Sequence, residues 1–136
     1  MGYRMHVVKV KEEYGINEAF NHRGENFADM LDALGCECQG QDGWCGDQFE
    51  CLKEKYRDAV KIVEYHVKYG ISDQTTLETI GVNPERENEI DLDDVPDTIE
   101  ELCTECNYTK ETLLEIMKDF LEEADPDWDW IKFVAF

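Results

Sequence analysis

Apolar residues recur at intervals of three and four along the middle of the chain, a spacing typical of helices that bury one face. The first stretch covers residues 25–34 and ends at Gly35, a residue type that commonly stops a helix. A longer stretch from Gln48 to Tyr69, with Gly70 after it, predicts the longest helix. Three further helices are expected: a short one from a Ser72 cap to Gly81, one opened by a capping box at Asp97–Glu100 that runs through Cys106, and one from Thr109 to Ala124.

The two ends of the chain follow a different pattern. Residues 3–10 and 128–136 are rich in β-branched and aromatic side chains and alternate as half-buried strands do. We expect these two strands to pair in one small sheet beside a bundle-like helical core, which makes the chain an α+β protein with a single domain over residues 1–136. Because aromatic residues often anchor interfaces, a homodimer or a partner surface built on the last strand stays open as an alternative.

The net charge of the chain is large and unevenly distributed. The 136 residues carry a formal net charge of −20. Residues 71–136 hold twenty Asp and Glu against four Lys and Arg, whereas residues 1–70 hold thirteen against nine. Like charges crowded on one domain repel each other and lower its stability, so this excess favours a cationic partner. It also disfavours direct binding to nucleic acid or to an anionic membrane.

Nothing in the sequence predicts export or insertion in a membrane. No run of about 18 uncharged apolar residues is present, and charged residues near the start interrupt any signal-peptide core. We therefore expect a cytoplasmic protein.

The acids are densest between residues 85 and 101, where Arg86 is the only base. We predict that a basic surface of another protein binds this segment, through Glu85, Glu87, Glu89, Asp91, Asp93, Asp94, Asp97, Glu100 and Glu101. If residues 85–93 are extended, their carboxylates project from one side about every 6.6 Å. A DNA duplex carries one charge per roughly 1.7 Å, so mimicry of nucleic acid needs a second acidic row, for which residues 119–129 are candidates.

Two other interpretations of the acidic segment stay open. The simpler one is a solvated loop that only keeps the protein soluble. The other is a calcium loop, because six residues fall at its ligand positions, although Asp94 stands where such a loop needs glycine; they are Glu89, Asp91, Asp93, Val95, Asp97 and Glu100.

The cysteines suggest an alternative function. Four of them, in the spacing C-x-C-x6-C-x5-C around a glycine-rich turn, would hold zinc in a structural or interaction module: Cys36, Cys38, Cys45 and Cys51. Unmodified thiols and disulfides are the competing interpretations. Cys103 and Cys106 have C-x2-C spacing but close a predicted helix on its apolar face, which favours buried thiols over a redox pair. No motif of hydrolases, nucleotide-binding enzymes or metalloproteases occurs, so we expect no catalysis and no cofactor other than zinc.

The ends of the chain carry a resemblance. Tyr3–Val8 with Glu13–Gly15, and Trp130–Phe136, resemble the ends of small acidic proteins encoded by phages and mobile elements. In size and acidity the chain is also similar to phage antirestriction and anti-CRISPR proteins, many of which occupy nucleic-acid-binding surfaces. The resemblance implies a non-enzymatic inhibitor or DNA mimic that acts in the cytoplasm of a bacterial host.

Overall fold

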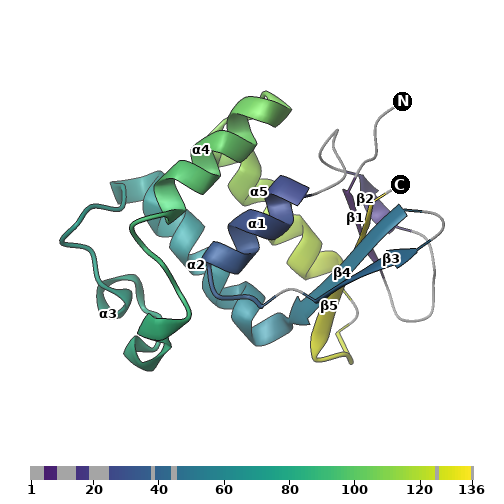
Figure 1. Ribbon diagram of the computed structural model, residues 1–136, viewed down its shortest axis with the longest axis horizontal. Coiled ribbons are helices and arrows are strands. Elements are labelled where there is room, and N and C mark those ends of the chain that lie inside the picture. The colour runs from purple at the N-terminus through teal and green to yellow at the C-terminus, as the bar shows by residue number, and fades with distance from the viewer. Residues whose placement is uncertain are drawn as a thin grey trace.

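The computed structural model describes the backbone of residues 5–8, 15–18, 25–37, 39–43, 46–124 and 126–135, and the side chains of residues 27, 29–37, 50–105, 107–124 and 126–133. Figure 1 shows the order of elements. They are β1 (Met5–Val8), β2 (Gly15–Glu18), α1 (Glu25–Ala33), β3 (Gln39–Gly43), β4 (Gly46–Leu52), α2 (Lys53–Tyr69), α3 (Leu77–Ile80), the 3-10 helix η1 (Pro84–Asn88), α4 (Val95–Cys106), α5 (Lys110–Glu123) and β5 (Trp130–Ala135).

The strands form one antiparallel sheet in the order β2-β1-β5-β4-β3. The expected pairing of the two chain ends is confirmed, because β1 lies beside β5 with Val7 opposite Phe133. On its other side β5 pairs with β4, where Phe49 is opposite Phe133. The α+β class is therefore confirmed, with a sheet larger than the two end strands alone.

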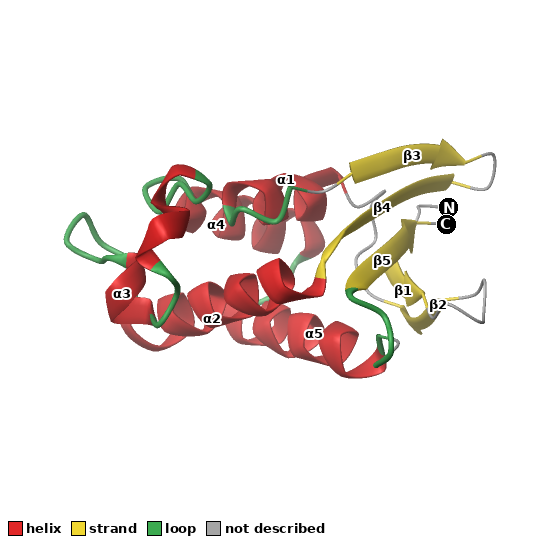
Figure 2. Ribbon diagram, turned by 90° about the horizontal axis from the view of Figure 1, so that it is seen from below, coloured by secondary structure: helices red, strands yellow, loops and turns green. Residues whose placement is uncertain are grey.

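The helices stand in two layers at one end of the molecule, with the sheet at the other (Figure 2). One layer contains α1 and α4, and the second contains α2 and α5. The second layer meets the sheet, since α2 contacts β4 and β5 while α5 contacts β1 and β2. Helix α3 and η1 lie together at the end of the molecule away from the sheet.

An aromatic cluster joins both layers to the sheet. The ring of Phe133 on β5 lies 5.4 Å from that of Phe27 on α1, 5.3 Å from that of Phe120 on α5 and 5.7 Å from that of Tyr56 on α2. All four side chains are fully buried, and each such ring removes a large apolar area from water. The Tyr56 hydroxyl donates a hydrogen bond of 2.8 Å to the carbonyl of Met117, so the polar end of this ring is satisfied inside the core.

The predicted helices over residues 25–34 and 109–124 are confirmed, with Thr109 accepting a hydrogen bond from Thr112 N as the cap of α5. The predicted start of the long helix at Gln48 is wrong. Residues 48–52 belong to β4, and α2 begins at Lys53. In this short stretch Phe49 and Cys51 also alternate with polar residues, and pairing with β5 decides between the two patterns.

Two predicted helix starts are also wrong. Ser72 lies in a turn, and Thr76 caps α3 by accepting a hydrogen bond from Thr79 N. Helix α4 begins at Val95 rather than at Asp97, because Pro96 fits the first turn of a helix and Thr98 N already bonds to Asp94 O. Asp97, the predicted cap, therefore lies inside the first turn of α4.

Candidate acidic interface

The acidic segment does not run as the extended ridge considered above. Residues 84–88 form η1, where Asn83 caps the turn by accepting a hydrogen bond from Glu85 N and Pro84 supplies the first helical position. Turns follow up to α4. Because the chain coils, the carboxylates face several directions and lose the regular spacing of a strand.

The segment is held on the helices by Arg86. Its guanidinium forms an ion pair with Asp58 of α2, donates a hydrogen bond of 2.8 Å to Gly35 O, and bonds to Glu89 at 3.0 Å. A backbone hydrogen bond from Asp91 N to Ala33 O ties the segment to the end of α1. The sole base among residues 85–101 therefore fixes the acidic segment in place.

Glu89 differs from its acidic neighbours because both of its oxygens are engaged. One accepts a hydrogen bond from Lys55 at 3.0 Å and the other from Arg86 at 3.0 Å. These two bonds lower the pKa of Glu89 to about 2. Its predicted contact with a partner stays a prediction, but this carboxylate already serves to attach the segment to α2.

The other predicted partner-binding residues are exposed, and no described residue forms an ion pair with any of them. They are Glu85, Glu87, Asp91, Asp93, Asp94, Asp97, Glu100 and Glu101. They belong to the α1–α4 layer and its extension into η1, which we call the acidic layer. Its acids number three in α1, six between residues 84 and 94, and four in α4, against a single base.

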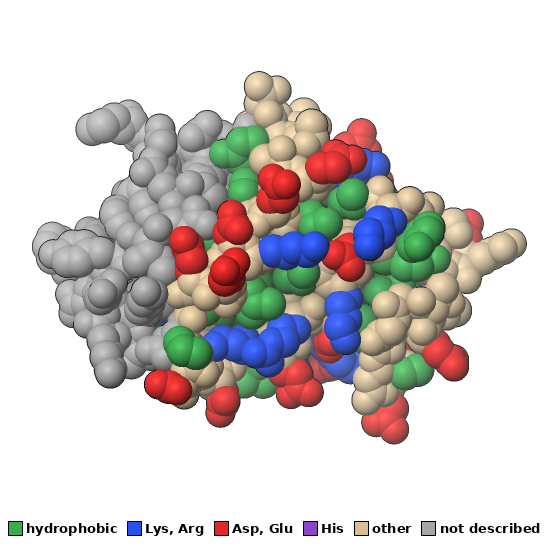
Figure 3. Space-filling model, turned by 180° about the vertical axis from the view of Figure 1, so that it is seen from behind, with side chains coloured by type: hydrophobic (Ala, Val, Ile, Leu, Met, Phe, Trp, Pro, Cys, Tyr) green, Lys and Arg blue, Asp and Glu red, His purple; other side chains and the backbone are tan. Residues whose placement is uncertain are grey.

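The α2–α5 layer has a different composition. It holds seven of the thirteen Lys and Arg residues, five in α2 and two in α5. Figure 3, the view from behind, shows Lys and Arg in the middle of this face with Asp and Glu mostly around them. Lys118 pairs with Glu64 at 2.7 Å, and its hydrogen bond lowers the pKa of Glu64. Two acids of this layer, Glu64 and Asp58, form ion pairs, whereas the eight exposed carboxylates of the acidic layer named above form none with a described residue.

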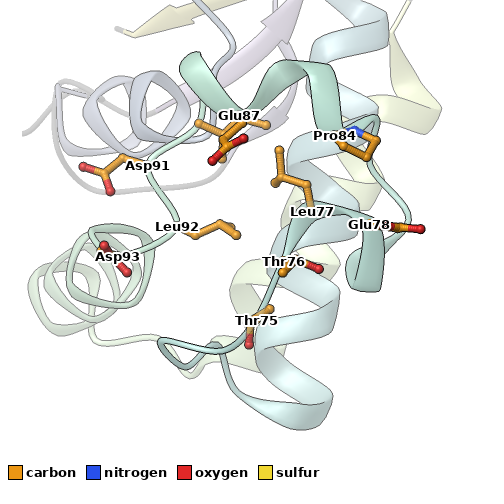
Figure 4. Close-up of a pocket in the computed structure, with 10 residues that line it drawn as sticks. Thr75, Thr76, Leu77, Glu78, Pro84, Glu87, Asp91, Leu92 and Asp93 are labelled. Atoms are coloured by element: carbon orange, nitrogen blue, oxygen red, sulfur yellow. The ribbon is translucent and has the colours of Figure 1, made fainter.

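A groove opens between the acidic segment and the residues around α3 (Figure 4). Its volume is about 410 Å³. Leu77 and Leu92 lie at its centre, with Thr75, Thr76 and Glu78 on one side and Glu87, Asp91 and Asp93 on the other. The full lining is Thr75, Thr76, Leu77, Glu78, Pro84, Glu87, Ile90, Asp91, Leu92 and Asp93. The lining contains four carboxylates and no Lys or Arg. A cation with an apolar stem matches this chemistry.

The second acidic row expected from residues 119–129 lies elsewhere. The end of α5 and the residues before β5 are beside the sheet, whereas η1 is at the far end of the molecule in both Figure 1 and Figure 2. The continuation of the acidic surface comes instead from α4, which follows the segment directly.

The predicted zinc ligands are only partly described. Cys38 and Cys45 lie outside the described residues. Cys36 and Cys51 are buried in the core, and the Cys36 thiol contacts Lys55 O at 3.6 Å. Both cysteines belong to the same buried cluster as Tyr56. Burial raises the pKa of the Tyr56 phenol, and Cys51 and Cys36 act in the same direction.

The other predicted metal and thiol features can be placed. Cys103 is buried, as expected for a core thiol. The twelve residues considered as a calcium loop end inside α4, so Val95, Asp97 and Glu100 are helical and no such loop forms. Within the described part of the chain, no cluster of three or more His, Cys, Asp or Glu could hold a metal ion.

Sequence reasoning missed the groove. The sequence predicts only a short helix that includes Thr75, Thr76 and Leu77. No local pattern shows that these residues face residues 84–93. Two turn-forming residues, Gly81 and Pro84, are the sequence feature that could have indicated the groove, because they allow residues 84–93 to fold back beside α3.

Comparison of the chain with protein-family models, curated proteins and solved structures gives no match. Among the described residues, no helix has the length and apolar character needed to cross a membrane.

Proposed function

We propose that the protein is a non-enzymatic binder whose acidic layer occupies a basic, nucleic-acid-binding surface of another protein. The observation that supports this proposal is the set of eight exposed carboxylates that have no ion-pair partner among the described residues, next to a layer that holds most of the bases. Surplus charge of one sign on one face steers a partner of the other sign and fixes its orientation.

The attachment of the segment by Arg86 adds to this proposal. A surface that is already fixed loses little conformational entropy when it binds, so more of the electrostatic attraction appears as affinity. Solubility alone does not require acids to be fixed in position. The partner is sought in the bacterial cytoplasm, as the resemblance to phage proteins implies.

A capture experiment with two matched variants tests the proposal. The tagged protein is used as bait in a bacterial lysate, beside a variant with Glu87→Gln, Asp91→Asn, Asp93→Asn and Asp97→Asn. The control variant removes four exposed acids from α5 instead: Glu111→Gln, Glu115→Gln, Asp119→Asn and Glu122→Gln. Each variant loses four negative charges, so the two differ only in where the charges are removed.

We expect the unchanged protein and the control variant to retain a nucleic-acid-binding protein that duplex DNA and raised salt displace. The first variant should lose it. Equal retention by both variants, or retention that DNA and salt do not affect, would contradict a specific role for the acidic layer and favour the solubility interpretation.

A further inference from the structure

The groove beside the acidic segment combines an apolar base with a charged wall. Leu77 is buried and Leu92 is half-buried, and the two face each other across the groove (Figure 4). Its volume of about 410 Å³ falls within the range of small binding sites, about 300–1,000 Å³. It has space for one long side chain and part of the residue next to it.

The charged wall consists of Glu87, Asp91 and Asp93. None of the three has an ion-pair partner in the part of the chain that the structure describes, whereas Glu89 in the same segment has two. An occupant must therefore be apolar along its stem and positively charged at its tip.

Both sides of the groove are held in position by the protein itself. On one side, Arg86 bonds to Gly35 O and to Asp58, and Ile90 packs at Gly35. On the other, Thr76 caps α3 and Gly81 ends it in the left-handed conformation. An occupant thus enters a formed groove, and binding costs little ordering of the protein.

Arginine meets these requirements better than lysine. Its aliphatic stem packs on apolar surface while the head stays at the polar rim. The guanidinium is planar and weakly hydrated, and it can bond to a carboxylate through two N–H groups at once. An ammonium group is a compact ion that loses more hydration at a half-apolar site.

We propose that the groove receives an arginine side chain of the basic partner, an inference that rests on the proposed function. The stem of this arginine packs on Leu77 and Leu92, and its guanidinium lies at the wall of carboxylates. The contact anchors the partner at one defined point, and the remaining acids attract its basic surface at longer range.

Two blocked pentapeptides test this assignment on the intact protein. They are acetyl-Gly-Leu-Arg-Leu-Gly-amide and the same peptide with citrulline, which keeps the shape of arginine but has no charge. Amide chemical shifts of the ¹⁵N-labelled protein report both affinity and position. We expect the arginine peptide to shift amides in residues 75–78 and 87–93, and to bind at least about tenfold tighter than the citrulline peptide, since hydrogen bonds to charged groups are the stronger ones.

A groove-filling variant, Leu92→Trp, separates this inference from the proposed function because it leaves every carboxylate in place. We expect it to bind the arginine peptide at least about tenfold more weakly. Unchanged affinity in this variant, equal affinity for the two peptides, or shifts confined to α4 would overturn the groove assignment. Each of these outcomes leaves the acidic layer to be decided by the capture experiment. If Leu92→Trp does not fold, the two peptides on the unchanged protein still decide the assignment.

Discussion

Gly35 packs against residues 86–90 of the acidic segment. Its replacement by alanine tests how that segment is attached. Gly35 has a φ of +79°, in the left-handed region that side chains disfavour. A Cβ atom added there would lie 2.7 Å from Ile90 Cγ1, 2.9 Å from Arg86 Nη2 and 3.2 Å from Glu89 O. The Arg86 head could swing away only by giving up its bond to Gly35 O, and Ile90 is buried.

Two costs add up in Gly35→Ala. The left-handed conformation costs a residue with a Cβ about 1–2 kcal/mol. Forcing a methyl group into a filled site costs about 1–3 kcal/mol more, because buried neighbours and backbone must shift. We therefore expect the free energy of unfolding to fall by about 2–5 kcal/mol, and binding at the groove to weaken because Ile90 and Arg86 are displaced.

Gly81→Ala is the matched control. Gly81 also has a positive φ, +99°, but a Cβ there meets nothing within 4 Å among the described residues. This variant should lose only the backbone part, about 1–2 kcal/mol. Urea denaturation followed by circular dichroism measures both variants. Equal losses in Gly35→Ala and Gly81→Ala would refute the close packing of the acidic segment on Gly35.

Two further predictions concern the buried Tyr56 and the half-buried His66. Tyr56→Phe removes the buried hydrogen bond to Met117 O and should lower the free energy of unfolding by about 1–2 kcal/mol in urea denaturation; an unchanged value would mean that the bond adds nothing. His66 accepts a hydrogen bond from Ile71 N at its Nδ1 atom, and burial, with Lys110 nearby, lowers the pKa of His66 below 6.5. Because the folded state disfavours the protonated ring, this contribution to stability is complete above pH about 6.5 and is lost as the pH falls through the folded pKa. His66→Asn keeps an acceptor without this titration, so its stability relative to the unchanged protein should rise between pH 7.5 and 5 (roughly the range of histidine titration); parallel pH profiles would contradict the prediction.

An element of this fold can be predicted from the sequence when the contacts that stabilise it depend on its own residue pattern. Helix α1 and the strands at the two chain ends were predicted correctly. In each of them the spacing of apolar residues matches the face that the element buries. Strand β3 has the sequence QGQDG, which has no strand propensity of its own, and it forms as the partner of β4. Its existence depends on a neighbour that periodicity does not reveal.

The acidic segment shows the same limit at the level of single residues. Glu87 and Glu89 are the same residue type two positions apart, and the sequence treats them alike. Only the fold brings Lys55, 34 residues earlier in the chain, to Glu89 and leaves Glu87 at the groove. The composition of the acidic surface could be predicted, whereas the division between carboxylates that hold the fold and those that remain exposed could not.

The uneven distribution of charge between the two helical layers gives this part of the molecule an electric dipole in addition to its net charge. A basic partner at a distance exerts a torque on this dipole and turns the acidic layer toward itself before any contact is made. The lysine-bearing face is turned away by the same field. Encounters should therefore begin in one orientation, and the rate of association should fall steeply as salt shortens the range of the field.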